Sequence, residues 1–268
     1  MTSHARSAAS SSVDFVVRGR RAIGPDPGRP WRVWDLDAEL RYVPVVDALP
    51  ATDLPICEVG SGPRGIAVWT TRSVIGVDPG ADDEHGDTAP PPNMRRVAGD
   101  GAAIPLADGT AGATIAVDTF EHIPADARGT VIAEMARVTA PGGRVIAMGP
   151  TGAPATGGDR RVLDRWKQRE DGANIVRWIS EHEELGLPTV DELTGHMAAN
   201  GLVDVRVHGV FNLRLWYTMH RALLGDFPQP PGDHRLHHLA WLPFATVARH
   251  LRRGPYYRYL VTGDVPRT

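Results

Sequence analysis

A glycine-rich turn in the first quarter of the chain carries the clearest chemical signal. An apolar run at 54–59 is followed by Gly60-Ser61-Gly62-Pro63-Arg64-Gly65. Glycines at the end of such a run let the backbone turn tightly and approach a ligand. A following helix would present free N–H groups to that ligand. The spacing also satisfies G-x-G-x-x-G, which suits a pyrophosphate at a helix N-terminus and permits a nicotinamide-dependent reductase.

Glu58 distinguishes between two classes of ligand by its charge. This carboxylate stands two residues before Gly60, and we expect it to face the same site. It would repel the phosphates of a dinucleotide, whereas it would attract a sulfonium and an α-amino group, directly or through water. The sequence therefore favours S-adenosylmethionine, unless Glu58 merely caps or pairs within the fold.

Two further carboxylates follow apolar runs. Asp78, with Pro79 and Gly80 after it, stands 18 residues after Gly60, where it could accept hydrogen bonds from ribose hydroxyls. Both dinucleotides and S-adenosylmethionine offer a ribose, so Asp78 does not discriminate between them. The Asp100 carboxylate could accept a hydrogen bond from the exocyclic amine of adenine, and Gly101 would allow the ligand to approach closely. Simple turns are the alternative at both places.

The segment Asp118-Thr119-Phe120-Glu121-His122 follows the next apolar run, and its side chains would face methyl donor and acceptor. Methyl transfer from a sulfonium is an in-line displacement that depends mainly on positioning. A base is needed only if the acceptor loses a proton, as a hydroxyl does. His122 is the leading candidate, although a capping or packing role stays open. His182 is a second candidate, with an exposed helix face as the alternative.

The other histidines and the single cysteine suggest no further chemistry. Five histidines near the C-terminus show no convincing ligand spacing with a carboxylate, so we expect no metal site: His220, His234, His237, His238 and His250. Cys57 lies in an apolar run and is expected to be a buried small hydrophobe.

Short apolar runs alternate with helix-length segments through the first half of the chain. This rhythm predicts βαβ units and a parallel sheet, with the ligand outside the carboxyl ends of the strands. The expected strands are 54–59, 73–77, 94–98, 114–117 and 144–148, and the expected helices are 63–70 and 126–139.

The remaining segments are less regular. We expect a helix at 35–49 that Pro44 bends or splits, a small-residue loop at 149–158 and a helix at 163–184. Thr189 and Glu192 form a capping-box pattern that opens a helix at 189–200. Strands at 202–210 and 256–262 follow. Residues 1–30 are predicted to be a flexible N-terminal segment, and 211–254 an inserted helical cap near the C-terminus.

Composition limits the partners. The 268 residues carry a net charge of −3, which gives no general attraction to nucleic acid or to an anionic membrane. The longest uncharged apolar run, 239–248, is too short for a membrane span. Residues 239–251 could still lie on a membrane or cover a greasy substrate, and a packed lid helix is the plainer interpretation. We expect a cytoplasmic enzyme with a small-molecule substrate.

Five segments in order over residues 56–149 resemble the class I S-adenosylmethionine-dependent methyltransferases, in particular the group that includes the ubiquinone- and menaquinone-biosynthesis C-methyltransferases. They are Glu58-Val59-Gly60-Ser61-Gly62, Val77-Asp78-Pro79, Gly99-Asp100-Gly101-Ala102-Ala103-Ile104-Pro105, Asp118-Thr119-Phe120-Glu121-His122-Ile123 and Arg137-Val138-Thr139-Ala140-Pro141-Gly142-Gly143. The chain departs from the family at Arg64, where a glycine often stands, and at Ala140, where lysine is common.

The resemblance implies a doubly wound α/β domain over 31–268, with a mostly parallel seven-stranded Rossmann-like sheet whose last strand is antiparallel. It implies that S-adenosylmethionine is the cofactor. The cofactor would be bound by Glu58, Gly60, Ser61, Gly62, Asp78, Pro79, Asp100, Gly101 and Asp118.

We therefore expect a methyltransferase, with O-methylation of a small metabolite or glycan-type acceptor as its reaction. An NAD(P)-dependent reductase is the first alternative. It is disfavoured because Lys167, the only lysine, has no tyrosine four residues before it. A non-catalytic S-adenosylmethionine-binding module is the second.

Overall fold

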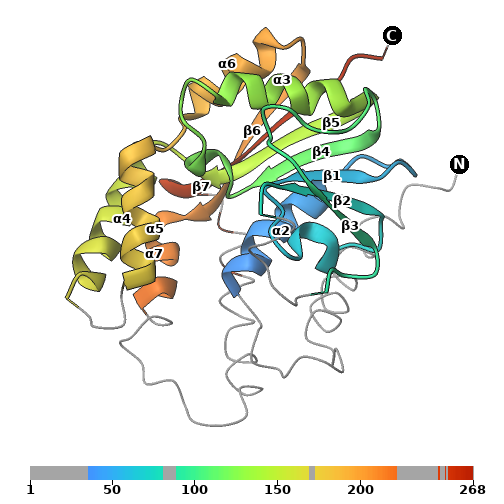
Figure 1. The fold of residues 1–268 in the computed structure, drawn as a ribbon. Coiled ribbons are helices and arrows are strands. Elements are labelled where there is room, and N and C mark those ends of the chain that lie inside the picture. The colour runs from blue at the N-terminus through green and yellow to red at the C-terminus, as the bar shows by residue number, and fades with distance from the viewer. Residues whose placement is uncertain are drawn as a thin grey trace, which may run out of the picture.

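The fold is a seven-stranded sheet with helices on both faces (Figure 1). The computed structural model describes residues 36–80, 89–168, 173–221, 247, 251 and 253–267. The strands lie in the order β3-β2-β1-β4-β5-β7-β6. Their bounds are β1 Ile56–Val59, β2 Val74–Asp78, β3 Met94–Ala98, β4 Ala111–Val117, β5 Thr139–Pro150, β6 Val203–Asn212 and β7 Tyr256–Asp264.

The first five strands are parallel, and β7 runs antiparallel to both of its neighbours, β5 and β6. This arrangement confirms the predicted doubly wound, mostly parallel seven-stranded sheet. The chain moves outward from β1 to β3 and then returns to the other side of β1 with β4. A topological switch point therefore lies between β1 and β4, which is where open α/β sheets bind ligands.

Each face of the sheet has its own hydrophobic core. Helices α3 Arg128–Val138 and α6 Val190–Ala199 cover one face and pack on alternate residues of the inner strands, such as Cys57 and Val59. Helix α2 Leu36–Ala48 and the short 3-10 helix η2 Gly65–Val68 cover the other, where Ile56 is buried. Side chains of a strand alternate between its faces, so a sheet covered on both sides needs apolar residues throughout.

A third group of helices packs together beside the β7 end of the sheet (Figure 1). It consists of α4 Gly152–Trp166, α5 Ala173–Leu185 and α7 Leu213–Arg221. Helix α5 packs against the 3-10 turn η3 Phe120–His122, which follows β4. The helical group therefore lies directly beside the segment in which we predicted the catalytic residue.

Several predicted elements differ from the structure. The segment 149–158, predicted to be a loop, contains the start of α4, and the predicted helix 163–184 is two helices. Small residues allow this close packing, because a Cβ at Gly158 would lie only 3.0 Å from Trp216 and from Leu213 of α7. The predicted helix 63–70 is only η2, since Gly65 has a φ of +46° that an α-helix does not accommodate. Pro44 lies inside α2 without splitting it.

The predicted flexible segment 1–30 lies outside the described residues. The predicted cap at 211–254 is described only as the end of β6, α7 and residues 247, 251, 253 and 254. Among the described helices, none combines the length and apolar character needed to cross a membrane.

The capping box at Thr189 is confirmed, and it supplies a first prediction. The Thr189 hydroxyl accepts from the backbone N–H of Glu192, and the Glu192 carboxylate accepts from that of Thr189. We expect Thr189→Ala to lower the free energy of unfolding by about 1 kcal/mol, since it leaves one helix donor without its partner. Urea unfolding measures the change. Thr194→Ala is the control, because this half-buried threonine lies within the same helix and its hydroxyl donates to the Asp191 backbone oxygen rather than capping the helix. An equal loss there would contradict the assignment.

Candidate active site

The glycine turn after β1 is fixed by its neighbours on both sides. Gly60 has a φ of +70°, and a Cβ there would lie 2.5 Å from Oγ1 of Thr119, just beyond β4. On the other side, the Asp78 carboxylate at the end of β2 accepts the backbone N–H of Gly62 at 2.9 Å. The predicted residues Gly60, Gly62 and Asp78 are thus brought together at the switch point.

Gly62 is the open position of this turn. Its φ is +54°, and no other described atom lies within 4 Å of where its Cβ would be. Asp78 binds the N–H of Gly80 with its second oxygen, at 3.0 Å. The Ser61 side chain, in contrast, points inward, since a Cβ at Gly76 would lie 2.5 Å from its hydroxyl. Pro79 is exposed.

Glu58 lies beneath the turn and is completely buried. Its Oε2 accepts the backbone N–H of Ile66 at 2.6 Å. A Cβ at Gly65 would lie 2.0 Å from the same oxygen, so this glycine makes room for the carboxylate. Burial raises the pKa of Glu58 to about 8, against the opposing effects of the Ile66 N–H and of the Tyr42 hydroxyl.

This position weakens the electrostatic argument drawn from the sequence. We expected the Glu58 carboxylate to face the ligand, whereas its Oε2 accepts the Ile66 N–H and its Oε1 has no hydrogen-bond partner among the described residues. Because the side chain is completely buried, a direct contact with a cationic ligand would need the surrounding residues to move. Gly65, the third glycine of the turn, therefore makes room for the Glu58 carboxylate rather than for a phosphate. The predicted role of Glu58 in cofactor binding stays a prediction.

Contacts within the protein account for both Asp100 and Gly101 in the turn after β3. Asp100 is exposed, and its Oδ1 accepts the backbone N–H of Ala102 at 2.8 Å. A Cβ at Gly101 would lie 2.8 Å from Cγ1 of Val59. Glycine is thus needed here for packing against β1. Asp100 is exposed, and its contact with an adenine amine stays a prediction.

Asp118, which the sequence predicts to contact the cofactor, is bound by arginine side chains of the protein. Its backbone has a φ of +47°, which is uncommon for a residue other than glycine. Arg258 of β7 binds both oxygens of Asp118, with Nη2 at 2.8 Å from Oδ2 and Nε at 3.0 Å from Oδ1. Arg41 of α2 approaches the same carboxylate at 3.1 Å. The carboxylate is thus part of a buried ion network that orients the loop after β4.

A second buried arginine fixes the rest of that loop. Arg128 of α3 donates to the backbone oxygens of Phe120 and Ile123, on either side of His122. Its guanidinium also pairs with Glu192. Sequence reasoning missed Arg41, Arg128 and Arg258, because nothing local in the sequence shows which distant carboxylate or carbonyl an arginine will meet.

His122, the predicted base, is engaged at both ring nitrogens. The indole N–H of Trp178 donates to Nε2 at 3.2 Å, and Nδ1 lies 3.2 Å from Oε2 of Glu181. Because tryptophan can only donate, Nε2 is the acceptor and Nδ1 carries the proton of the neutral ring. Burial and the neighbouring His182 lower the pKa of His122, against the effect of Glu181.

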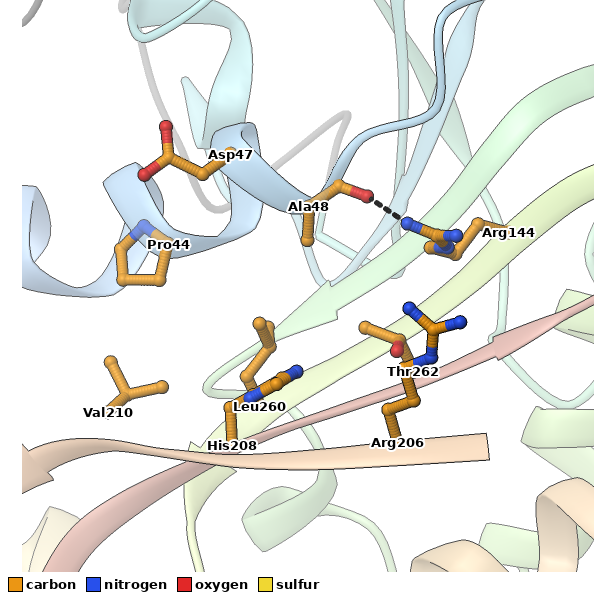
Figure 2. Close-up of a pocket in the computed structure, with 9 residues that line it drawn as sticks. All are labelled: Pro44, Asp47, Ala48, Arg144, Arg206, His208, Val210, Leu260 and Thr262. Carbon is orange, nitrogen blue, oxygen red and sulfur yellow. Dashed lines mark hydrogen bonds between the residues drawn. The ribbon is translucent and has the colours of Figure 1, made fainter. Parts of the chain in front are cut away.

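A separate pocket lies between α2 and the strands β5, β7 and β6 (Figure 2). Arg144 crosses one end of it and donates to the backbone oxygen of Ala48 at 2.9 Å. None of the predicted site residues is among those that line this pocket: Pro44, Asp47, Ala48, Arg144, Arg206, His208, Val210, Leu260 and Thr262. The residues for which the sequence predicts a functional role lie elsewhere, mainly at the carboxyl ends of β1, β2 and β4.

Comparison with known proteins agrees with this fold. Residues 57–147 match the model of a methyltransferase domain family. An uncharacterized methyltransferase of Mycobacterium sp. (strain KMS) is 32% identical over 149 residues, which are 48% of this chain and 58% of the relative. A second, from strain JLS, is 30% identical over the same coverage. The chain thus spans less than two thirds of these curated relatives.

Two solved structures share the fold at low sequence identity. Geranyl diphosphate C-methyltransferase from Streptomyces coelicolor A3(2), in complex with Mg²⁺, geranyl diphosphate and S-adenosyl-L-homocysteine, aligns with a TM-score of 0.53 and 18% identity over 92% of this chain and 86% of that one. A methyltransferase from Thermotoga maritima aligns with a TM-score of 0.54 and 15% identity over 96% of each chain.

The match confirms the resemblance that the sequence motifs indicated. Residues 57–147 are similar to a methyltransferase domain family, and the chain resembles the class I S-adenosylmethionine-dependent methyltransferases. The matched residues run from β1 into β5. They therefore include the glycine turn, Asp78, Asp100 and the loop after β4.

The raised pKa of Glu58 predicts a pH-dependent stability. The folded state holds this proton up to about pH 8, whereas the unfolded chain releases it near pH 4.3. The stabilisation that comes from holding this proton is therefore complete below the pKa of the unfolded chain. It is lost as the pH rises through the pKa of the folded protein. We expect the stability of the wild type relative to Glu58→Gln to fall between about pH 5 and about pH 8. Urea unfolding at both pH values measures this difference.

Glu184→Gln, which changes an exposed glutamate, is the matched control and should show no comparable trend. A wild type that gains stability relative to Glu58→Gln as the pH rises would show that the buried acid is charged in the folded protein. The sign of the slope thus separates a protonated Glu58 from an ionised one.

Proposed function

We propose that this protein is an S-adenosylmethionine-dependent methyltransferase, and that its acceptor is a hydroxyl of a small metabolite or glycan-type molecule. The observation that carries the first part is the glycine turn at the β1–β4 switch point. There, Gly62 leaves open space and Asp78 presents a carboxylate beside it. The match of residues 57–147 to a methyltransferase domain supports the same assignment.

The local structure disfavours the alternative of an NAD(P)-dependent reductase. A pyrophosphate is bound by free N–H groups at the start of a helix. Here the element after the turn is only the four-residue 3-10 helix η2, and the Ile66 N–H in its first turn already donates to Glu58.

The acceptor is inferred from the groups beside the donor site. Glu121, His122 and His182 gather where β4 ends, beside the Asp118–Thr119 segment. Polar groups of this kind are of use for an acceptor that must lose a proton, as a hydroxyl does. In the present arrangement, however, the Nε2 lone pair of His122 is taken by Trp178. A base role for His122 would require that hydrogen bond to break.

Cofactor binding is tested by substitution at the open glycine. Asparagine tolerates a left-handed backbone, so Gly62→Asn should fold while placing a side chain in the expected ligand space. We predict a loss of S-adenosylhomocysteine affinity of at least about tenfold, which is about 1.4 kcal/mol. Asp78→Ala should weaken binding as well. Calorimetric titration measures both changes.

Gly201→Asn is the matched control, because Gly201 also has a positive φ of +76° and open space around it. It lies between α6 and β6, outside the predicted site. Undiminished binding in both Gly62→Asn and Asp78→Ala would refute the site. Binding of NAD in place of S-adenosylhomocysteine would refute the function.

The acceptor class is tested with labelled methyl donor. We expect transfer from S-adenosylmethionine to phenolic or sugar hydroxyls in a panel that also contains amines and prenyl diphosphates. Identification of the methylated atom by NMR decides the class. Products methylated only at carbon would contradict the hydroxyl assignment and would make the reaction like that of the geranyl diphosphate C-methyltransferase.

A further inference from the structure

Three side chains that could bind a metal ion converge beside the donor site. Glu121 and His122 lie on η3, and His182 lies on α5. One ligand atom from each residue lies within 4.8 Å of the other two. The cluster lies where η3, which follows β4, packs against α5 of the helical group. His182 lies 60 positions after His122 in the sequence.

Glu121 is the first reason to consider a ligand here. It is completely buried, and neither carboxylate oxygen has a hydrogen-bond partner among the described residues. A Cβ at Gly149 would lie 3.1 Å from Oε2 of Glu121, so β5 approaches the group closely on one side. Burying a carboxyl without a partner is costly, and native proteins rarely retain such a group without a use for it.

His182 supplies an independent second reason. It is 2% exposed, and its Nε2 is buried without a partner in the described structure. Its other nitrogen, Nδ1, lies 3.0 Å from Oδ2 of the buried Asp159. Oδ1 of Asp159 accepts the Tyr257 hydroxyl at 2.6 Å. The sequence alternative of an exposed helix face for His182 is therefore wrong.

This arrangement fixes which nitrogen of His182 is available. Because the Asp159 carboxylate accepts from Nδ1–H, the neutral ring keeps its lone pair on Nε2. A histidine whose second nitrogen donates to a carboxylate is the usual form of a metal-bound histidine, since the carboxylate orients the ring and increases its basicity. Asp159 and Tyr257 thus hold the ring in the state that a metal ion requires.

We propose that Glu121, His122 and His182 bind one divalent transition-metal ion, of the Zn²⁺ or Co²⁺ type. One carboxylate oxygen and two imidazole nitrogens suit these ions, whereas Mg²⁺ prefers oxygen ligands. Three protein ligands leave at least one coordination position open, as in catalytic zinc sites. From the sequence we expected no metal site. The three ligands come from two distant segments, so their spacing in the chain does not show that they meet.

The surroundings can accommodate the added charge. The charged side chains around the cluster are Asp159, which contacts His182, Glu181, which pairs with His122, and Asp118 with its partners Arg41 and Arg258, which form their own network. Burial, with Asp118 beside it, raises the pKa of Glu121 against the opposing effect of the two arginines. A bound cation would compensate the carboxylate directly. His122 would exchange one of its present contacts, Trp178 or Glu181, for the metal.

The consequence for the reaction rests on the proposed function. An acceptor hydroxyl in the open position would lose its proton to water more readily, because a bound metal ion lowers the pKa of an oxygen ligand. The acceptor oxygen then forms its bond to the methyl carbon as the S–CH₃ bond breaks. The electron pair of that bond stays on sulfur, so the products are the methyl ether, S-adenosylhomocysteine and one proton.

The test is metal binding by the full chain without S-adenosylmethionine. We expect the chelator-stripped protein to bind one equivalent of Co²⁺, with visible absorption of a low-coordinate ion, and Zn²⁺ to displace it. Glu121→Gln and His182→Gln should each weaken binding at least about 100-fold, and Asp159→Asn, which removes only the orienting carboxylate, by about 10- to 100-fold. Glu184→Gln and His208→Gln, both exposed, should bind like the wild type.

Thermal unfolding of the metal-free variants separates binding from folding. Glu121→Gln should melt no lower than the metal-free wild type, because it removes a buried carboxyl that has no partner. Absence of Co²⁺ and Zn²⁺ binding, binding undiminished in the ligand variants, or preference for Mg²⁺ would overturn the proposal. S-adenosylhomocysteine titration of the stripped protein tests the proposed function separately, so that failure of either is recognised.

Discussion

The buried ion pair between Asp118 and Arg258 is the interaction on which the site geometry depends. It joins the end of β4 to β7 across 140 residues of sequence and holds Asp118 in a left-handed backbone conformation. Removing one partner of such a pair leaves an uncompensated buried charge, which typically costs about 3–5 kcal/mol. The turn that this pair fixes brings Thr119 against Gly60 and directs Glu121 and His122 toward α5. The proposed cofactor site and the proposed metal site therefore share one anchor.

Local sequence signals were sufficient for the framework of the fold. Strands β1 to β5 follow from short apolar runs that end in glycine or aspartate, and the capping box at Thr189 marked the start of α6 to the residue. These features depend on neighbours in the chain, so the sequence expresses them directly. The cluster of Gly60, Gly62 and Asp78 was predictable for the same reason, because parallel strands place their carboxyl ends at one edge.

Contacts between distant segments were not accessible in this way. The start of α4 at Gly152 looked like a loop because its glycines and Pro154 are poor helix formers, and packing against Trp216 explains the glycine at 158. The position of Glu58 was misjudged, since a carboxylate before a glycine turn can point outward or beneath the turn, and only the fold decides. The role of His182 depends on Asp159 and Tyr257, which come from two other elements.

Helix α2 touches both acidic groups of the site through adjacent residues. Arg41 binds Asp118, and the Tyr42 hydroxyl lowers the pKa of Glu58, so the helix spans the ends of β4 and β1. A ligand that takes the Glu58 carboxylate would have to displace Tyr42 from its side. Its apparent affinity is then lower than its intrinsic affinity by the fraction of molecules in which α2 has released that contact. The docking equilibrium of one N-terminal helix would thereby set the concentration at which the cofactor site fills.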